Sequence, residues 1–435
     1  MSKKADAIII GAGIIGCAVA FELAKKGFKT LNIDKLPTAG FGPTSNSCAI
    51  IRAHYSTFEG TAFAYDNFWY WLNWQDYLGV EDELGFAKYH DTGTIWIPNQ
   101  IHGYKHILEL YEQVGVKYEI WDRERLFQKL PVVTANSNWP PRRPENDDFW
   151  QDSGDKIDLA IFTPGSGYVS DPQLATHNLM RAAEAKGGEF LFNQEVVAIR
   201  HAQNRVQGVT LRDGSEIDTP IVINVAGPHS FIINRMAGVE EEMNVKTRPL
   251  RHEVHHVPSP NKFNFETDGI HVSDGDSSIY FRPEVGNAIM VGSEDPPCDV
   301  KEWVADPDVY NRAVTESQWK AQVYRLAKRI PDLPVPEKPK GVVDLYDVSD
   351  DWIPIYDRSA LDGFYMAIGT SGNQFKNAAG AGHMLSEIIE ACENGKNHDI
   401  EPLQYKLPNI GLTINAGFFS RNRAVNPDSS FSVLG

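Results

Sequence analysis

The chain has 435 residues, enough for two or three domain-sized units, and its 42% hydrophobic content is typical of a soluble globular protein. Its net charge of −17 is spread along the chain without a Lys/Arg-rich run, which argues against nucleic acid or an anionic membrane surface as a partner. No apolar run approaches the roughly 20 residues of a membrane span. The four cysteines lie far apart without CxxC spacing, so we expect no zinc site, no disulfide framework and a cytoplasmic location.

The first forty residues predict a strand, a glycine turn, a helix and a second strand, in that order. The apolar strand 7–10 runs into the turn "GAGIIG" at 11–16, and a helical pattern continues to Lys26. The second strand, 30–33, ends on Asp34, about twenty residues after the glycines. This order is typical of a dinucleotide-binding unit.

Each residue of the turn has a physical reason to be there. Gly11 permits the tight turn, Gly13 lets a pyrophosphate approach the backbone, and Gly16 allows close packing of the helix. Asp34 is placed to accept hydrogen bonds from ribose hydroxyl groups, and Ile15 lies within the turn itself. Because the chain begins with this unit and has no second convincing copy, the pattern favours a single bound FAD.

The middle of the chain predicts further elements of the same domain. The aromatic-rich stretch 63–77 predicts a buried helix, favoured over an aromatic substrate box. Residues 140–155 are Pro-rich and charged and predict an exposed loop. An amphipathic helix is expected over 172–186, followed by a strand through Val197 and a hairpin that turns at 213–214.

The last two hundred residues predict a second domain and a return to the first. Residues 245–300 alternate apolar and polar side chains, as in an antiparallel sheet, and helical character returns between 309 and 329. The Pro-rich stretch 331–341 predicts a rigid crossing back. A strand, a glycine-containing turn and a helix are expected over 364–391, where the glycines of 378–382 predict close helix packing rather than a second nucleotide site.

In this order the segments resemble the D-amino-acid-oxidase-type family of FAD flavoproteins, which includes glycine oxidase and the sarcosine oxidases. The resemblance spans almost the whole chain and is carried by "IIIGAGIIGCAVAFELAKKG", "TSNSCAIIRAHYS", "GYVSDPQLATHNLMRAAEAKGGEF", "IVINVAGPHS", "DLYDVSDDWIPIYD" and "GTSGNQFKNAAGAGHML". It implies an α/β, Rossmann-like FAD-binding domain that is discontinuous, and an α+β substrate domain built on an antiparallel sheet. The implied limits are 1–90, 156–240 and 340–400 for the FAD domain, 91–155 and 241–339 for the substrate domain, and 401–435 for a C-terminal tail.

The resemblance also implies which positions contact the cofactor. The ADP-binding positions, with the lysine that follows the acid, are Gly11, Gly13, Gly16, Asp34 and Lys35. The loop near the flavin, the backbone at the adenine and the strand end beside the cofactor correspond to Ser45, Val197, Ala226 and Gly227. The turn near the isoalloxazine ring corresponds to Gly369, Ser371, Gly372, Asn373, Gln374, Phe375 and Lys376.

Two departures from the family bear on the flavin. Asp344 stands where the monomeric sarcosine oxidases carry the cysteine bonded to flavin, and residues 44–55 lack the tryptophan-histidine attachment pattern of a related branch. We therefore expect non-covalent FAD. A second basic residue of the family is replaced by Ala49, and the oxygen-activating lysine of the family has no secure counterpart here, so oxidase and dehydrogenase both stay open.

Arg52 and Lys376 are the candidate substrate ligands. In the sarcosine-oxidase branch an arginine in "IIR" and a lysine in a late "GFK"-like turn hold the substrate carboxylate, and "AIIR" and "QFK" match them here. A guanidinium fork binds a carboxylate bidentately, and an ammonium adds a point charge. The alternative for Arg52 is a buried ion pair with an Asp or Glu. Tyr346 matches a pocket tyrosine of the family, its alternative being an ordinary strand aromatic.

The stretch "RHEVHH" adds candidate histidines on a predicted strand. Alternation places His252 and Glu253 on opposite faces and puts Glu253 and His255 together. A metal site is the weaker interpretation because no third ligand is suggested. His255 is the candidate among these residues for a place at the flavin.

These features predict an FAD-dependent amino-acid or amine oxidoreductase. The expected reaction is oxidation of the C–N bond of a small, secondary or N-substituted amino acid by hydride transfer from the α-carbon to flavin, followed by imine hydrolysis. The expected partners are a small carboxylate-bearing substrate and oxygen or another electron acceptor. One alternative is an oxidoreductase of 2-hydroxy acids or polyol phosphates; another is a non-catalytic flavoprotein subunit of a homo- or hetero-oligomer, docked through residues 417–435.

Overall fold

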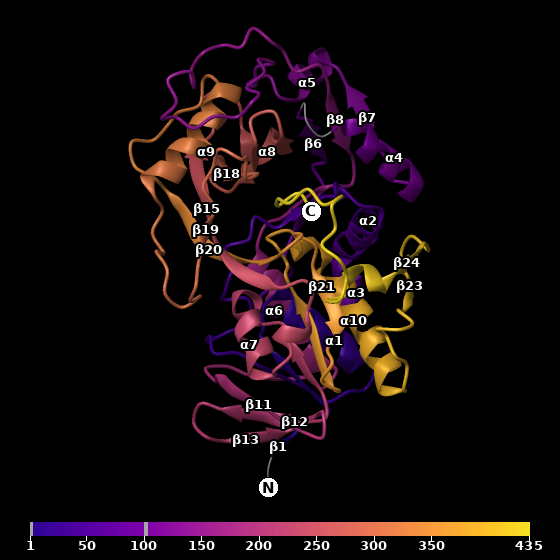
Figure 1. The fold of residues 1–435 in the computed structure, drawn as a ribbon. Helices are drawn as coiled ribbons and strands as arrows, with labels where there is room; N and C mark the ends of the chain where they lie inside the picture. The colour runs from indigo at the N-terminus through magenta and orange to yellow at the C-terminus, as the bar shows by residue number, and fades with distance from the viewer. Residues whose placement is uncertain (1–2, 100–102) are drawn as a thin grey trace.

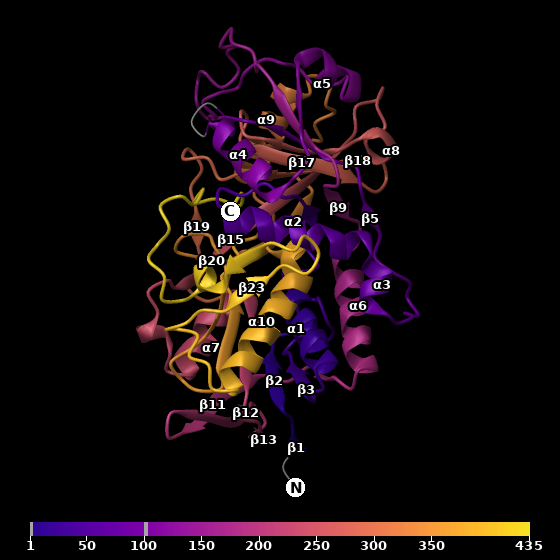
Figure 2. The same ribbon diagram turned by 90° about the vertical axis from the view of Figure 1, so that its right-hand side faces the viewer.

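The computed structural model describes residues 3–99 and 103–435, which form two stacked lobes (Figure 1). The lower lobe in Figure 1 contains helix α1 (Ile14–Lys25), and the upper lobe contains α5 (Arg123–Lys129) and α9 (Glu316–Arg329). Residue 435 lies between the lobes in both Figure 1 and Figure 2. The last segment of the chain therefore returns to the junction of the two lobes.

The lower lobe is built on a six-stranded sheet in which β21 alone runs antiparallel to its neighbour. Almost every residue of this sheet's central strands is buried, so apolar runs without alternation mark them in the sequence. The strands predicted at 7–10 and 30–33 are confirmed. In spatial order the strands are β10 (Glu189–Leu191), β3 (Thr30–Ile33), β2 (Ala7–Ile10), β14 (Val222–Asn224), β22 (Phe364–Ile368) and β21 (Ile355–Arg358).

Helices cover one face of this sheet. They are α1, α6 (Pro172–Ala185) and α10 (Ala378–Glu393), whose buried residues form one apolar cluster with the strands. A Cβ atom on Gly382 would lie 2.6 Å from the carbonyl carbon of Ala18, so α10 and α1 touch through their backbones. The prediction of close helix packing at 378–382 is confirmed.

The other face of the six-stranded sheet packs on helix α7 (Ser230–Met236) and on a small sheet. Two of that sheet's strands form the hairpin predicted to turn at 213–214. Its strands are β1 (Lys3–Lys4), β13 (Glu216–Asp218), β12 (Arg205–Leu211) and β11 (Val196–Ala202).

The aromatic stretch predicted as one helix forms two, α2 (Phe58–Leu72) and α3 (Trp74–Leu78). Asn73 breaks the helix, with φ −114° and ψ 37°. Trp71 is buried and stacks on Trp74, with ring centroids 4.4 Å apart. The aromatics thus belong largely to the core, as expected for a buried helix.

The upper lobe contains a nine-stranded, mostly antiparallel sheet. Its strand β20 pairs with β15, and β16 and β6 are parallel. The strands are β19 (Glu302–Trp303), β15 (Thr247–Pro258), β18 (Ala288–Ser293), β17 (Ile279–Glu284), β16 (His271–Asp274), β6 (Thr94–Ile97), β8 (Ala160–Thr163), β7 (Glu119–Trp121) and β20 (Gly341–Ser349). The predicted limits place β8 and β20 in the FAD domain, whereas both strands pair in this larger sheet.

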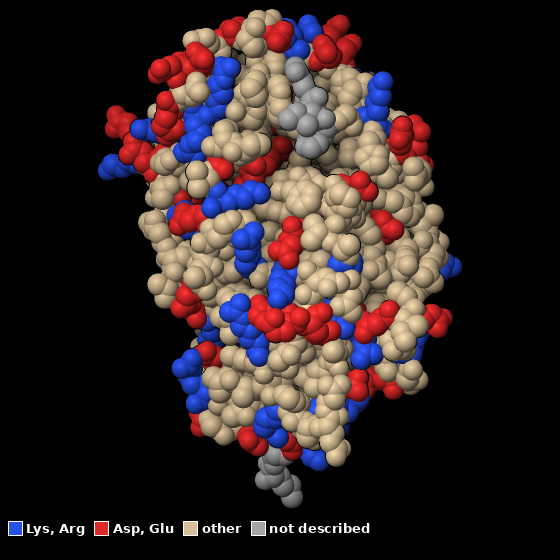
Figure 3. Space-filling model, in the orientation of Figure 1, with Lys and Arg blue, Asp and Glu red and all other residues tan. Residues whose placement is uncertain are grey.

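The remaining elements connect or cover the sheets. Residues 140–155 contain neither helix nor strand, as predicted for a loop. No helix in the described part of the chain has the length and apolar character needed to cross a membrane. On the face seen in Figure 3, basic and acidic side chains are interspersed. The connecting elements are α4 (Tyr104–Val114), α8 (Phe265–Asp268), β4 (Ile50–Ile51), β5 (Tyr89–His90), β9 (Gly167–Val169), β23 (Gln404–Lys406), β24 (Thr413–Asn415) and the short 3₁₀ turns η1 (Gly227–His229), η2 (Glu240–Glu242), η3 (Phe375–Asn377) and η4 (Ala416–Phe419).

Candidate active site between the two sheets

The turn between β2 and α1 leaves no room for side chains at two of its glycines. A Cβ on Gly11, whose φ is +117°, would lie 2.5 Å from the Val225 carbonyl oxygen, and a Cβ on Gly16 would lie 2.3 Å from the Gly11 carbonyl oxygen. A Cβ on Gly13 would approach only the hydroxyl of Thr44, at 3.2 Å. The backbone at Gly13 is therefore the open part of the turn.

This open part lies at the amino end of α1. Gly13 precedes the helix and has no side chain to cap it, the Ile14 N–H donates to Thr44 Oγ1 at 3.3 Å, and Ile15 is buried in the first turn. The amino end of a helix carries partial positive charge and unpaired N–H groups, which suit a pyrophosphate. The turn therefore fits a dinucleotide such as FAD.

Asp34, at the end of β3, is tied to the same turn. Its Oδ2 accepts from the backbone N–H of Ala12 at 2.7 Å, and its Oδ1 accepts from that of Leu36 at 2.9 Å. Burial raises the pKa of Asp34, while the two backbone donors oppose the shift. The neighbouring Lys35 is partly exposed, and its Nζ pairs with Asp308 at 2.6 Å and lies 2.9 Å from His229 Nε2.

The structure places the other predicted cofactor positions on several elements. Ser45 lies in a turn, where its hydroxyl donates to the Gly42 carbonyl at 2.9 Å. Val197 lies on β11 with an exposed side chain. Ala226 and Gly227 follow β14, and the Ala226 N–H donates to Asn224 Oδ1 at 3.2 Å. Strands β14 and β2 are paired, so Ala226 and Gly227 lie beside the glycine turn.

The turn after β22 is held in a conformation that favours glycine. Gly369, Ser371 and Gly372 all have positive φ, at 66°, 47° and 70°. Asp347 fixes this turn, because its Oδ2 accepts from the Gly369 N–H and its carbonyl oxygen accepts from the Ser371 N–H, both at 2.7 Å. A Cβ on Gly372 would lie 2.5 Å from the Tyr346 ring. Tyr346 therefore packs directly on the predicted flavin turn.

Burial raises the pKa of Asp347 to about 7, while the Gly369 N–H holds it down. The rest of the turn enters the lower core. Phe375 stacks on Trp71 with centroids 5.2 Å apart, and Gln374 Oε1 accepts from the hydroxyl of Tyr356 at 2.9 Å. The 369–376 turn is thus fixed by Asp347 of the upper sheet and by Trp71 and Tyr356 of the lower core.

Arg52 and Lys376, far apart in the sequence, both lie against Tyr55. The Arg52 guanidinium lies 5.1 Å and the Lys376 ammonium 5.3 Å from the centroid of the Tyr55 ring. Both side chains are buried, and Lys376 Nζ donates to the hydroxyl of Tyr55 at 3.1 Å and to the Asn373 carbonyl at 2.6 Å. Burial, and then the charge of Arg52, hold the pKa of Lys376 well below its usual value. The structure therefore brings the two predicted carboxylate ligands together.

The partner of Arg52 is the end of the chain rather than an acidic residue. Its guanidinium donates to the carbonyl oxygens of Val433, at 2.7 Å, and Leu434, at 3.3 Å, and to that of His54. The hydroxyl of Ser56 donates to the Gly435 carbonyl at 2.8 Å. The ion pair considered as an alternative for Arg52 is not among the ion pairs of the described residues, and no sequence pattern pointed to the tail.

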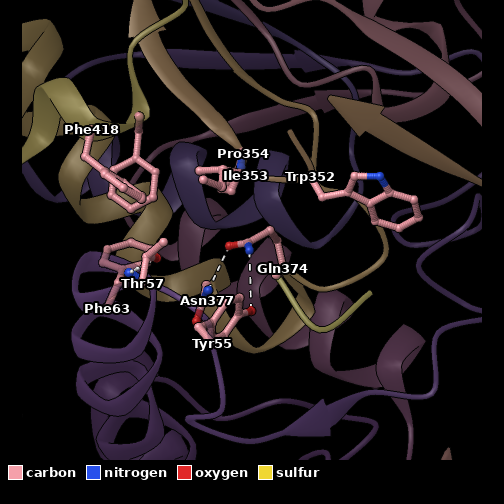
Figure 4. Close-up of a pocket in the computed structure, with 12 residues that line it drawn as sticks. Tyr55, Thr57, Phe63, Trp352, Ile353, Pro354, Gln374, Asn377 and Phe418 are labelled. Atoms are coloured by element: carbon pink, nitrogen blue, oxygen red, sulfur yellow. Dashed lines mark hydrogen bonds between the residues drawn. The ribbon is translucent and has the colours of Figure 1, made fainter. Parts of the chain in front are cut away.

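The tail fills the space next to Tyr55. A Cβ on Gly435 would lie 2.3 Å from the Tyr55 ring, and the cavity left there is about 10 Å³, roughly the space of one water molecule. Figure 4 shows Tyr55, Gln374 and Asn377 on one side of this cavity, with Trp352 and Phe418 on others. Gln374 bridges Tyr55, at 3.4 Å, and Asn377, at 2.7 Å.

The pairing register of the upper sheet shows which of its residues face this region. Directly paired residues share a face, so Ser273, Tyr280 and Gly292 lie on one face, with His271 two residues before Ser273 on the same side. Tyr280 packs with Cys48 and Val433 of the junction. We call the face that carries these residues the inner face. His271 and Glu294, which sequence reasoning missed, lie on it.

The predicted histidines divide between the two faces. His252 lies on the inner face, where its ring stacks on Tyr346 with centroids 4.2 Å apart. His255 lies on the other face, with its Nε2 3.6 Å from Glu253, and burial lowers its pKa to about 3. The structure thus brings Tyr346 to the junction and leaves His255 behind the sheet.

Comparison with known proteins agrees with this arrangement. Residues 6–388 match the family model described as FAD dependent oxidoreductase (DAO), so the chain belongs to this family and is an FAD-dependent oxidoreductase. It is 23% identical over 404 residues to human mitochondrial sarcosine dehydrogenase, covering 89% of this chain but 40% of that protein. It is also 23% identical to monomeric sarcosine oxidase of Bacillus sp. strain B-0618, covering 94% of this chain and 97% of that one.

Solved structures agree on the fold. L-proline dehydrogenase from P. horikoshii superposes with a TM-score of 0.75 at 20% identity, covering 97% of this chain and 98% of that one. The fold predicted from the resemblance, an FAD-binding α/β domain with a second domain on an antiparallel sheet, is confirmed.

Proposed function

We propose that this flavoenzyme oxidises the C–N bond of a small amino acid, secondary or N-substituted, by transfer of a hydride from the α-carbon to the flavin. The imine product is then hydrolysed. The observation that carries the proposal is the buried pair of Arg52 and Lys376 around Tyr55. A buried guanidinium and a buried amine that contact the same ring favour an anionic ligand, because an anion would stabilise positive charge on both groups and a guanidinium binds a carboxylate bidentately.

The relatives support the substrate class. The names of the similar proteins refer to sarcosine and to L-proline, which are both secondary amines with an α-carboxylate. Identities near 20% do not carry a substrate over to this chain.

We propose that the FAD is bound without a covalent bond. Asp344 occupies the position where the resemblance would require a cysteine, and its carboxylate accepts from Asn46 Nδ2 at 2.7 Å and from the Tyr310 hydroxyl at 3.3 Å. A carboxylate cannot form the thioether. The bound cofactor would accept the hydride, and the glycine turn, the 369–376 turn and Tyr346 would hold it.

We call Arg52 and Lys376, which would hold the substrate carboxylate, the clamp. Binding of a carboxylate there requires a movement of the tail. The carbonyl oxygens of Val433 and Leu434 occupy Arg52 donors that a substrate carboxylate would need. A charged acceptor forms stronger hydrogen bonds with a guanidinium than a neutral carbonyl does. A carboxylate is therefore able to replace the tail on Arg52.

The four free cysteines suit the reducing, cytoplasmic location that we propose. Oxygen or another acceptor would then reoxidise the flavin.

Anaerobic reduction of the flavin tests this function. The FAD-loaded protein is mixed with amino acids, N-methyl amino acids and 2-hydroxy acids, and bleaching of the visible flavin spectrum is followed in the wild type, Arg52→Ala and Arg212→Ala. Arg212 is an exposed arginine paired with Glu195, so it serves as the matched control. We expect bleaching by an N-substituted amino acid in the wild type and the control, and its loss in Arg52→Ala.

Two other outcomes would contradict the proposal. Bleaching by hydroxy acids alone would indicate a 2-hydroxy-acid oxidoreductase. No bleaching by any of these compounds would indicate a flavoprotein without amino-acid turnover.

A further inference from the structure

The inner face of the upper sheet carries a buried carboxyl group that the clamp does not use. Glu294 follows β18, and its backbone N–H donates to the Ser278 carbonyl at 3.1 Å. Its side chain contacts Ser273, which shares the inner face with its paired residue Tyr280, so Glu294 lies on that face with them. The exposed fraction of Glu294 is 5%. A carboxyl group this deeply buried normally has a partner.

The partner of Glu294 is a hydroxyl group rather than a cation. Its Oε1 accepts from Ser273 Oγ at 2.5 Å. Within the described part of the chain, no lysine, arginine or histidine forms an ion pair with it. The carboxyl group is therefore held in place but not neutralised.

Charged groups surround Glu294 from several elements. Asp274 on β16 and Asp295 next in the chain repel a negative charge on it, whereas Arg52 of the clamp attracts one. Burial has the largest effect and raises the pKa of Glu294 to about 8. The charge of Arg52 thus acts on the protonation of Glu294, which links this carboxyl group to the proposed carboxylate site.

A histidine on the same face also points to a ligand. His271 is 1% exposed, its Nδ1 lies 3.1 Å from Thr94 Oγ1, and its Nε2 has no partner. Burial lowers its pKa well below the usual value, followed by the charge of Arg52. His271 is therefore neutral and offers an unsatisfied polar atom beside Ser273, which holds Glu294.

The proposed reaction needs a proton acceptor, and this part of the argument rests on the function proposed above. An amino acid in water is a zwitterion whose nitrogen carries a proton. Hydride departure from the α-carbon requires the nitrogen lone pair, so the ammonium must first lose that proton. The acceptor must lie near the clamp, because the nitrogen and the carboxylate share one carbon atom.

We propose that Glu294, held by Ser273, is this proton acceptor and receives the amino end of the substrate. The N–H bond of the ammonium breaks, its electron pair stays on the nitrogen, and the proton forms an O–H bond with the Glu294 carboxylate. The neutral amine then releases its α-hydrogen as hydride to the flavin. Arg52 and Lys376 hold the carboxylate end, so the substrate spans from the lower lobe to the inner face.

Glu294→Gln tests this assignment in the FAD-loaded enzyme, because it keeps the shape and removes the base. The rate of anaerobic flavin bleaching by the substrate found above is measured from pH 6 to pH 10. In the wild type we expect the rate to rise about tenfold per pH unit below pH 8 and then to level off, because Glu294 must be ionised. In Glu294→Gln we expect a rate at pH 8 that is lower by roughly 10²-fold and that still rises at pH 10.

Further variants and a second readout separate this role from a structural one. Affinity for acetate, which has no amine, is measured from the shift that it causes in the flavin spectrum and should change less than about twofold in Glu294→Gln. Glu294→Asp should restore the levelling near pH 8 at a reduced rate. Glu302→Gln, an exposed glutamate on the edge strand β19, is the control and should behave like the wild type.

The outcomes distinguish the inference from the proposed function. If the wild type is bleached and Glu294→Gln keeps the same pH profile, the inference is overturned and Lys376 becomes the candidate base. Loss of acetate binding in Glu294→Gln would also overturn it, since the residue would then be structural. If no amine bleaches the wild type, the proposed function fails and this inference fails with it.

Discussion

The two faces of the nine-stranded sheet are built from the same strands but differ in chemistry. The outer face presents residues such as Ile279, Phe281 and Val291, which are fully buried in the apolar cluster that includes α9. The inner face presents Tyr280 and His271, which are also buried but polar. Neighbouring residues alternate between the faces, so one residue builds the core and the next one builds the site.

The largest expected effect is a loss of stability from a substitution on the outer face. Phe281→Ala removes a fully buried ring and should lower the free energy of unfolding by about 3–5 kcal/mol. Tyr280→Phe, its neighbour on the inner face, loses the contacts of its hydroxyl with Cys48 and Tyr346 but keeps the ring, and should change stability by less than about 1 kcal/mol. Urea unfolding of the FAD-loaded proteins measures both. Equal losses would show that the two faces do not differ as described.

The next effect concerns the clamp. Arg52→Ala should weaken acetate binding about 100-fold, roughly 3 kcal/mol, because a buried charge-assisted contact is lost. Arg52→Lys should recover only part of it, since an ammonium cannot form the bidentate contact. Titration of the flavin spectrum with acetate measures these affinities. Unchanged affinity in Arg52→Ala would exclude Arg52 as the carboxylate ligand.

Glu294 links the inner face to pH-dependent stability. Its pKa of about 8 in the folded state lies above the ordinary value of 4.5, so between these pH values the folded state keeps a proton that the unfolded state has lost. This contribution makes stability fall as pH rises through the window. The stability of Glu294→Gln relative to that of the wild type should therefore rise by about 2 kcal/mol between pH 6.5 and pH 8, at about 1.4 kcal/mol per pH unit. If the difference in stability between Glu294→Gln and the wild type is the same at both pH values, the pKa of Glu294 is not raised in the folded state.

The smallest expected effect concerns the tail. Deletion of residues 429–435 removes the carbonyl groups that compete for Arg52 and should tighten acetate binding about tenfold. The same spectral titration measures it, with far-UV circular dichroism as a control for folding. Weaker binding after the deletion would mean that the tail forms part of the pocket instead of competing with its ligand.

Much of the lower lobe could be predicted because its signals are local. The strands Ala7–Ile10 and Thr30–Ile33 are short apolar runs next to glycines or an acid, and the steric reason for Gly16 is the nearby Gly11 carbonyl. Family motifs placed Arg52 and Lys376 at one site, although 324 positions separate their numbers (376 − 52).

The inner face could not be predicted, because it depends on pairing between strands. His255 and His252 belong to one strand, and only the register with β18 and β20 shows that His255 points away from the site. Glu294 follows a strand end with no motif around it. The contact of Arg52 with Val433 joins two loops at opposite ends of the chain, and no local pattern marks such a pair.

A crystal structure of the FAD-loaded protein, reduced and soaked with the bleaching amino acid, tests the central claim most directly. We predict that the carboxylate lies between Arg52 and Lys376, that the nitrogen faces Glu294, and that the carbonyl groups of Val433 and Leu434 have left Arg52. A ligand bound elsewhere, with Arg52 still held by the tail, would contradict this account.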